Sequence, residues 1–385
     1  MMPLRLLAQP RLRAVAAQIA LALAVLWFVY EMITNTATNM SSRGLTPGVS
    51  FLNDVAGFDI MFSLIPYDRG ASYATAIVVG LLNTLLVAVC GIITATIIGF
   101  VIGVMRLSSN WIVRQTATIY VEIIRNIPLL LQMFVWYKAV LKALPNPRDS
   151  MNLGDMFFLS NRGVIVPKPM FESGSWVLPT AIGLGIVGSF FLRRWARARQ
   201  ERTGQAFPAI LTSLAMIIVL PILAFVLAGT PVSFEYAELK GFNFVGGLSL
   251  QPEFMALYLA LSIYTAAFIS EIVRGGILAV SKGQTEAANA LGLRSGPTLR
   301  LVVIPQAMRV IIPPLASQYL NLTKNSSLAV AIGYPDFVYA GGTVLNQTGQ
   351  AVTVVMIWMS VYLTISLITS GFMNWFNARM RFKER

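Results

Sequence analysis

Long apolar stretches, separated by short polar segments, recur along the whole 385-residue chain. A helix of about 20 residues spans a hydrocarbon core of roughly 30 Å and satisfies its own backbone hydrogen bonds within lipid. With 56% hydrophobic and only 12% charged residues, the chain does not fit the soluble globular class. We predict an all-α polytopic membrane protein of about eight transmembrane helices, at 15–33, 74–105, 118–144, 176–192, 209–228, 253–280, 301–321 and 351–376.

Two of these stretches have an alternative. Basic residues precede the first stretch, as in a cleaved signal peptide, but Trp27 and Phe28 at its outer end are typical of a retained anchor. Pro305, Pro313 and Pro314 interrupt the seventh stretch, so part of it could lie along the membrane surface.

Lysine and arginine outnumber aspartate and glutamate by 29 to 16. No soluble basic domain is present, so we expect no nucleic acid partner. The positive-inside rule converts the excess into an orientation with both termini in the cytoplasm. The loop at 145–175 would then be external, where its basic residues are accompanied by acidic ones. The cytoplasmic charges include Arg5, Arg11 and Arg13, the cluster Arg193, Arg194, Arg197, Arg199 and Arg202, and Arg379, Arg381, Lys383 and Arg385. For the cluster, binding of anionic lipid headgroups is an alternative to a topology signal.

The chain has no histidine and one cysteine, Cys90, which lies in an apolar stretch. Histidine-based triads, imidazole metal sites and intramolecular disulfides are therefore excluded. The sequence also lacks a G-x-x-x-x-G-K-[ST] loop for nucleotide phosphates. We expect no metal site, no cofactor and no enzymatic activity in this chain.

The loop from Ser281 to Arg300 is less basic than the other cytoplasmic loops and predicts a short helix at 285–292. Thr285 can cap its start, and Gly292 suits the left-handed position after its end. Ala287, Ala290 and Leu291 would form a small apolar face outside the membrane. Such a face suits docking into a groove on a soluble protein, and an amphipathic helix resting on lipid is the alternative.

This segment resembles the EAA signature of ABC importer permeases. The match consists of Glu286-Ala287-Ala288, Gly292 and the run from Val302 to Pro305, where the family more often has other aliphatic residues. The resemblance implies a coupling helix that sits in a cleft of a cytoplasmic ABC ATPase dimer. Its residues here would be Glu286, Ala287, Ala288 and Gly292.

Two further regions resemble polar amino acid permeases: Asn83 to Leu85 with Tyr120 to Leu130, and Tyr264 to Gly276 with Lys324 to Leu328. The layout is similar to the large permease subunits of general L-amino acid and glutamate/glutamine/aspartate uptake systems. It implies a five-helix type I importer core at 74–144 and 253–385, with three added helices, one in 1–73 and two in an insertion at 145–252. The implied location is the bacterial inner membrane, and the implied partners are a homologous permease subunit, the ATPase dimer and a periplasmic amino acid binding protein.

Ionisable and polar residues within the stretches are candidates for function. Glu122 with Arg125, and Glu271 with Arg274, are spaced for i, i+3 ion pairs that are either structural or part of a gate. Lys324, beside Asn325, Ser326 and Ser327, could neutralise a substrate carboxylate, or its ammonium could extend to the membrane surface. Asn83, Thr84 and Gln132 are weaker candidates for the substrate path, because such groups more often bond a neighbouring helix.

The expected function is that of a permease subunit that translocates polar L-amino acids, driven by a separate ATPase. An ion-coupled secondary amino acid transporter, with Glu122 or Glu271 as its proton site, is the alternative. An intramembrane enzyme fits least, because no suitable pair of catalytic groups stands out.

Overall fold

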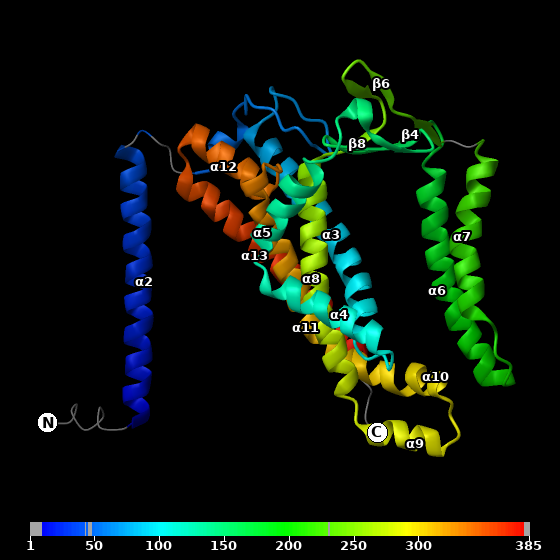
Figure 1. Ribbon diagram of the computed structural model, residues 1–385. Helices are drawn as coiled ribbons and strands as arrows, with labels where there is room; N and C mark the ends of the chain where they lie inside the picture. The colour runs from blue at the N-terminus through cyan, green and yellow to red at the C-terminus, as the bar shows by residue number, and fades with distance from the viewer. Residues whose placement is uncertain (1–9, 43, 45–47, 230–231, 381–385) are drawn as a thin grey trace. The chain divides into compact units, whose positions relative to one another are not determined.

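The computed structural model describes residues 10–42, 44, 48–229 and 232–380 (Figure 1). Within this part of the chain, seven helices are long and apolar enough to cross a membrane. They are α2 (Pro10–Ser42), α3 (Tyr73–Met105), α6 (Val177–Thr203), α7 (Ala209–Leu227), α8 (Pro252–Leu278), the segment 295–332 and α13 (Ala351–Met380). The predicted multi-span helical fold is confirmed. Arg5, Arg381, Lys383 and Arg385, used above to orient the termini, lie outside the described residues.

The third predicted span is not one straight helix. The stretch at 118–144 forms α4 (Trp111–Asn126) and α5 (Leu129–Phe134), continued by the π-helical turn η2 (Val135–Leu141), with a bend of 103° between the two parts. Pro128 has no N–H for the carbonyl of Ile124 four residues earlier. The side-chain amide of Gln132 donates to Ile124 O and to Ile127 O, at 2.8 Å each. The bend is therefore stabilised by a side chain that replaces the missing backbone donor.

One compact unit comprises residues 1–133 and 257–385. Glycines allow α3 to approach its neighbours closely: a Cβ at Gly99 would lie 2.6 Å from Cβ of Ile269, and one at Gly103 would lie 2.8 Å from Ser270 O. These contacts pack α3 directly against α8, as expected for small residues in membrane helices. The unit also contains η1 (Ser50–Asn53), α9 (Lys282–Ala290), α10 (Ser295–Thr298), η4 (Leu299–Val303), α11 (Ile304–Asn325), η5 (Ser326–Ile332) and α12 (Phe337–Thr348).

Helix α12 was not anticipated from the sequence. Asp336 caps it by accepting a hydrogen bond from the Tyr339 N–H at 2.8 Å. Its inner face joins an apolar cluster with the start of α3, η1 and the start of α13. The cluster consists of Phe51, Ile77, Phe337, Val344 and Val354. The segment after the seventh span is thus part of the packed core rather than a simple loop.

The second compact unit, Phe134–Ala256, contains the insertion that the sequence predicted at 145–252. The helices α6 and α7 form an antiparallel hairpin, in which Ser189 Oγ donates to Ser213 O at 3.2 Å and Gly204 turns the chain with a φ of 70°. The same unit also contains short strands, which the all-helical prediction did not include. They are β1 (Met151–Leu153), β2 (Phe157–Ser160), β3 (Gly163–Val166), β4 (Lys168–Phe171), β5 (Val232–Glu235), β6 (Glu238–Lys240), β7 (Asn243–Val245) and β8 (Leu248–Leu250).

The strands form three small antiparallel sheets. One sheet has the order β1-β2-β3-β8, and the pairs β4-β5 and β6-β7 form the others. Val164 pairs with Leu250 and Lys168 with Glu235, so strands on either side of the α6–α7 hairpin close on each other. The two ends of the insertion are held together by these ladders. A short helix, η3 (Pro147–Asp149), precedes the first strand.

Candidate functional site

Helix α9 follows α8 and lies next to α10 (Figure 1). It begins at Lys282, three residues before the predicted start, so Gly283 and Thr285 lie within the helix and Thr285 is not its cap. Its end agrees with the prediction: Gly292 has a φ of 77°. The Gly292 N–H donates to Asn289 O at 2.9 Å, and the Leu293 N–H donates to Ala288 O at 3.1 Å. This pair of hydrogen bonds is a Schellman motif, which ends the helix at a defined point.

The faces of α9 differ in exposure. Ala288 is buried, with 4% of its surface exposed, because it faces the adjoining helices. Glu286, Ala287 and Ala290 are exposed, and Leu291 is 81% exposed. The Gln306 side-chain amide donates to Gln284 Oε1 at 3.1 Å and so joins α9 to α11. The helix is therefore attached to the core and presents a small uncovered apolar surface beside one carboxylate.

A cluster of charges lies where α3, α4 and α8 meet. The Glu271 carboxylate binds Arg106 and Arg274, the latter at 2.6 Å, and lies 3.9 Å from the Arg125 guanidinium. The Arg125 guanidinium also lies 5.1 Å from the centre of the Phe268 ring. A cavity of about 440 Å³ borders these side chains and Glu122.

The expected pair between Glu122 and Arg125 does not form, and the pair between Glu271 and Arg274 does. Glu122 is exposed, with no ion pair among the described residues, whereas Glu271 lies between helices and is 31% exposed. A partly desolvated carboxylate gains more from a nearby cation than a solvated one, so Arg125 lies closer to Glu271. The third partner, Arg106, was not among the candidates that the sequence indicated. Its place in the cap of a span could have indicated that it reaches a neighbouring helix.

Asn83 and Thr84 are fully buried and bind the chain next to α12. The Asn83 amide donates to Phe62 O and Pro335 O at 2.8 and 2.9 Å, and Thr84 Oγ1 accepts from the Phe337 N–H at 3.0 Å. Tyr334, which is also fully buried, donates to Asn83 O at 3.2 Å. The amide of Gln132 is used at the bend between α4 and α5, as described above. The amide donors of Asn83 and Gln132 and the hydroxyl oxygen of Thr84 are thus already used within the fold.

The polar residues at the end of α11 differ among themselves. Ser326 is buried and Ser327 is not, and their hydroxyls donate to Thr323 O and Lys324 O, each at 2.8 Å. Asn325 is half-buried. Lys324 is exposed and has no ion pair within the described part of the chain. Lys324 is therefore the most exposed residue of this set.

Lys324 follows closely on a residue that packs against the middle of α3. The Leu322 side chain packs at Gly91, 3.3 Å from where a Cβ would lie, and Gly91 is near the middle of α3. At 1.5 Å per residue, each end of α3 is roughly 20 Å or more away. Extension of a lysine to the surface relies on a position near the end of a helix. Measured along α3, Lys324 does not lie at such a position.

A set of helices long and apolar enough to cross a membrane, with an exposed helix attached to the core, fits a multi-pass membrane protein. A family model described as "Binding-protein-dependent transport system inner membrane component" matches residues 202–382. The chain belongs to this family of ABC transporter permeases and is a multi-pass inner membrane protein.

Relatives of nearly the same length support the assignment. The general L-amino acid transport system permease protein AapQ of Rhizobium johnstonii is 53% identical over 98% of this chain and 94% of its own. The putative amino-acid ABC transporter permease protein YhdX of Escherichia coli is 51% identical, over 98% and 96%. The glutamate/glutamine/aspartate/asparagine transport system permease protein BztB of Rhodobacter capsulatus is 42% identical, over 97% and 95%. The predicted family is confirmed, the matches fit the expected type I importer fold, and the ion-coupled alternative receives no support.

Proposed function

We propose that this chain is the permease subunit of an importer for polar L-amino acids, and that a separate subunit hydrolyses the ATP that drives transport. The relatives whose printed names describe general L-amino acid, amino-acid and glutamate/glutamine/aspartate/asparagine transport support this substrate class. The exposed surface of α9 is the observation that carries the mechanism. In this proposal it docks into the ATPase and transmits the motion of that subunit to the membrane helices.

The structure of α9 suits this task. Small side chains at Ala287 and Ala290 allow a partner to approach the backbone closely, and Leu291 adds apolar contact. Glu286 supplies a charge at the rim, and Gly292 ends the helix at a fixed position. Ala288 is buried, so its role is to seat α9 on the core rather than to touch the partner.

The complete importer in this proposal has four kinds of component. A periplasmic binding protein delivers the amino acid, this chain and a homologous permease subunit form the path, and an ATPase dimer binds the cytoplasmic face. Both termini of this chain and α9 are placed in the cytoplasm, and the strands of the insertion are placed outside. The positive-inside distribution of arginines supports that orientation. Membrane lipid surrounds the spans.

Lys324 is proposed to bind the α-carboxylate of the substrate. An exposed ammonium near mid-depth is costly in lipid, roughly 2.5–3.5 kcal/mol on insertion scales, unless it faces water, an anion or a partner helix. Asn325 and Ser327 accompany it on the substrate path, whereas Ser326, Asn83, Thr84 and Gln132 serve the fold. Replacement of Lys324 by alanine is expected to impair uptake and leave assembly of the complex intact. Unchanged uptake kinetics would remove Lys324 from the substrate path.

The ion pairs around Glu271 are proposed to be structural, because they join three helices. A gating role for Glu122 and Arg125 is retained as the alternative, since both border the cavity and are exposed. The two roles differ in their effects: loss of a structural pair lowers thermal stability, while loss of a gate changes ATP hydrolysis in the absence of substrate.

The central experiment is reconstitution of the purified complex in lipid vesicles. ATP hydrolysis should rise when the amino acid-loaded binding protein is added, and Glu286→Arg should abolish that rise. Glu172→Arg, an equal charge reversal at an exposed residue of the insertion, is the matched control and should respond like the wild type. If Glu286→Arg responds normally, α9 is not the coupling element. If no ATPase copurifies and uptake continues after ATP depletion, the importer function itself is wrong.

A further inference from the structure

The α6–α7 hairpin is largely uncovered by protein. In the most apolar stretch of each helix, 17% of the residues of α6 and 6% of those of α7 are buried. Their mutual contact runs along one side, through Ser189 and Gly185 of α6. Large apolar side chains such as Ile186 and Phe190 are exposed on the other sides. In a membrane these sides contact lipid acyl chains.

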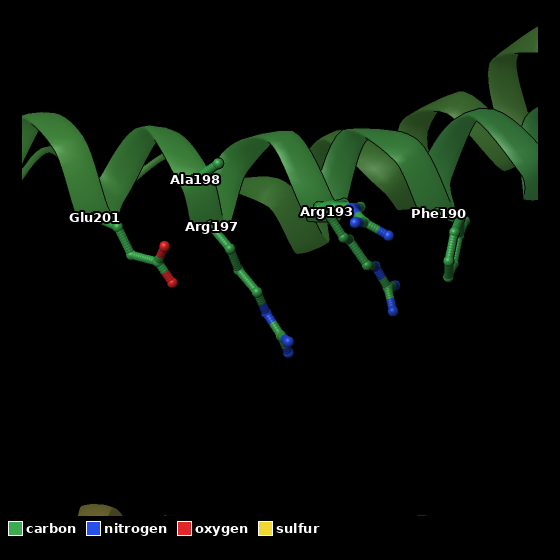
Figure 2. Close-up of a pocket in the computed structure, with 6 residues that line it drawn as sticks. Phe190, Arg193, Arg197, Ala198 and Glu201 are labelled. Atoms are coloured by element: carbon green, nitrogen blue, oxygen red, sulfur yellow. The ribbon is translucent and has the colours of Figure 1, made fainter.

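Three arginines follow directly where the apolar part of α6 ends. Arg193, Arg194 and Arg197 lie on one face with Phe190, because the spacings of three and four residues repeat the helical turn. Figure 2 shows Phe190, Arg193, Arg197 and Glu201 pointing to the same side of the helix. They line a cavity of about 550 Å³.

These cations have no carboxylate partner in the part of the chain that the structure describes. Arg193 Nε donates to Ser213 Oγ at 3.3 Å, which ties the first arginine of the cluster to α7. No ion pair joins the three arginines to a carboxylate among the described residues, although Glu201 lines the same cavity. The cavity is therefore lined by three guanidinium groups and one carboxylate, and it carries excess positive charge.

The depth of the cluster matches the headgroup layer. At 1.5 Å per residue, Arg193 to Arg197 lie about 2–8 Å beyond Leu192, the last apolar residue of the span. The headgroup region on each side of a bilayer is roughly 5–8 Å thick. Trp195 packs edge to face against Phe207 with ring centres 5.3 Å apart, as aromatic residues often do at this depth. By contrast, Arg199 lies on the opposite face, with its guanidinium 5.4 Å from the Trp195 ring centre.

We propose that Arg193, Arg194 and Arg197 form a binding site for the headgroup of an anionic phospholipid. The guanidinium groups bind the phosphate, which matches their planar fork of donors, and an acyl chain lies along Phe190 and the apolar face below. A soluble phosphate would use only the upper half of this site. The continuous apolar surface beneath the charges is what favours a lipid as the occupant.

The test measures binding of fluorescent phosphatidylglycerol to the purified complex in a neutral detergent. Arg194→Gln/Arg197→Gln should weaken binding roughly tenfold or more, since each arginine contributes to attraction of an anionic headgroup. Arg199→Gln/Arg202→Gln removes the same charge from the same helix. It should weaken binding about twofold at most, because these two arginines do not line the cavity and solvent screens their charges.

Three further arms complete the test. Phosphatidylcholine should bind much more weakly than phosphatidylglycerol, and inorganic phosphate should fail to displace the lipid. Arg194→Lys/Arg197→Lys keeps the charge that orients α6 in the membrane but loses the forked geometry, and it should bind with intermediate affinity. If the glutamine variant fails to insert into the membrane, the lysine variant still tests the role of the arginines in lipid binding. Equal weakening by both glutamine variants, equal binding of both lipids, or displacement by phosphate would overturn the proposal.

Discussion

Glu271 is the carboxylate that arginines from α3, α4 and α8 share. Replacement by glutamine would leave three guanidinium groups facing one another. We expect Glu271→Gln to lower the free energy of unfolding by roughly 2 kcal/mol, less than for a fully buried pair because part of the side chain is solvated. Glu122 borders the same cavity and has no ion pair with another described residue, so Glu122→Gln should change the free energy of unfolding by about 0.5 kcal/mol at most. Thermal unfolding of the purified complex in detergent measures both, and equal effects would mean that the shared pairs do not stabilise the protein.

Asp336 is a second residue whose charge state depends on its surroundings in the fold. It is fully buried between the seventh and eighth spans, and burial raises its pKa to about 7 although backbone N–H groups bind it. The buried Tyr334 and the half-buried Tyr362 lie near it, and neither carries a positive charge that would stabilise the carboxylate. In the unfolded chain the carboxyl has its ordinary pKa near 3.8. Between about pH 4 and pH 7, the folded state therefore keeps a proton on Asp336 that the unfolded state has lost.

The sign of the pH dependence follows from that difference. The contribution of Asp336 to stability is fully present below about pH 4 and is lost as the pH rises through about 7. Asp336→Asn stays neutral and can still cap α12. We expect thermal unfolding temperatures of the wild type to fall between pH 5 and 8 relative to Asp336→Asn, as measured in parallel detergent samples. Parallel pH curves would show that Asp336 is ionised in the folded protein.

At the scale of an element, the bend between α4 and α5 depends on one amide. Gln132→Leu keeps the volume but leaves Ile124 O and Ile127 O without that donor. We expect a loss of about 1–3 kcal/mol in the free energy of unfolding, which is typical of a buried unsatisfied polar group. Pro128→Ala restores a backbone N–H for Ile124 O, so the double variant Pro128→Ala/Gln132→Leu should recover part of the loss. No recovery in thermal unfolding would mean that Gln132 stabilises the bend in another way.

The same bend shows which parts of the fold the sequence could predict. The spans were predictable because hydrocarbon thickness sets their length, and Gly292 was predictable because few residues other than glycine adopt a positive φ readily. The bend was missed because Pro128 marks a break, while the donor that stabilises it comes from a side chain that only the folded structure brings close. The strands were missed because they are three or four residues long, and Val164 pairs with Leu250, which lies beyond the α6–α7 hairpin in the sequence.

For the charged cluster, spacing indicated a Glu122–Arg125 pair, but burial made Glu271 the carboxylate that Arg125 approaches.

For the whole molecule, the orientation in the membrane decides whether α9 can meet a cytoplasmic ATPase. The single cysteine makes this measurable, because Cys90→Ala leaves no native thiol. Leu153→Cys in β1 and Leu291→Cys after α9 are a matched pair, since the native side chains are 74% and 81% exposed. We expect a membrane-impermeant maleimide to label position 153 in intact spheroplasts and position 291 only after permeabilisation, because the positive-inside rule places these residues on opposite sides.

Two controls make the labelling decisive. Both positions should react fully after solubilisation in denaturing detergent, which shows that neither thiol is chemically blocked. Labelling in cells that lack the ATPase and binding protein separates membrane protection from coverage by a partner. If position 291 reacts from outside in such cells while position 153 does not, the chain is inverted relative to the charge distribution. Helix α9 could then not contact an ATPase in the cytoplasm, and the coupling role of Glu286 would fail with it.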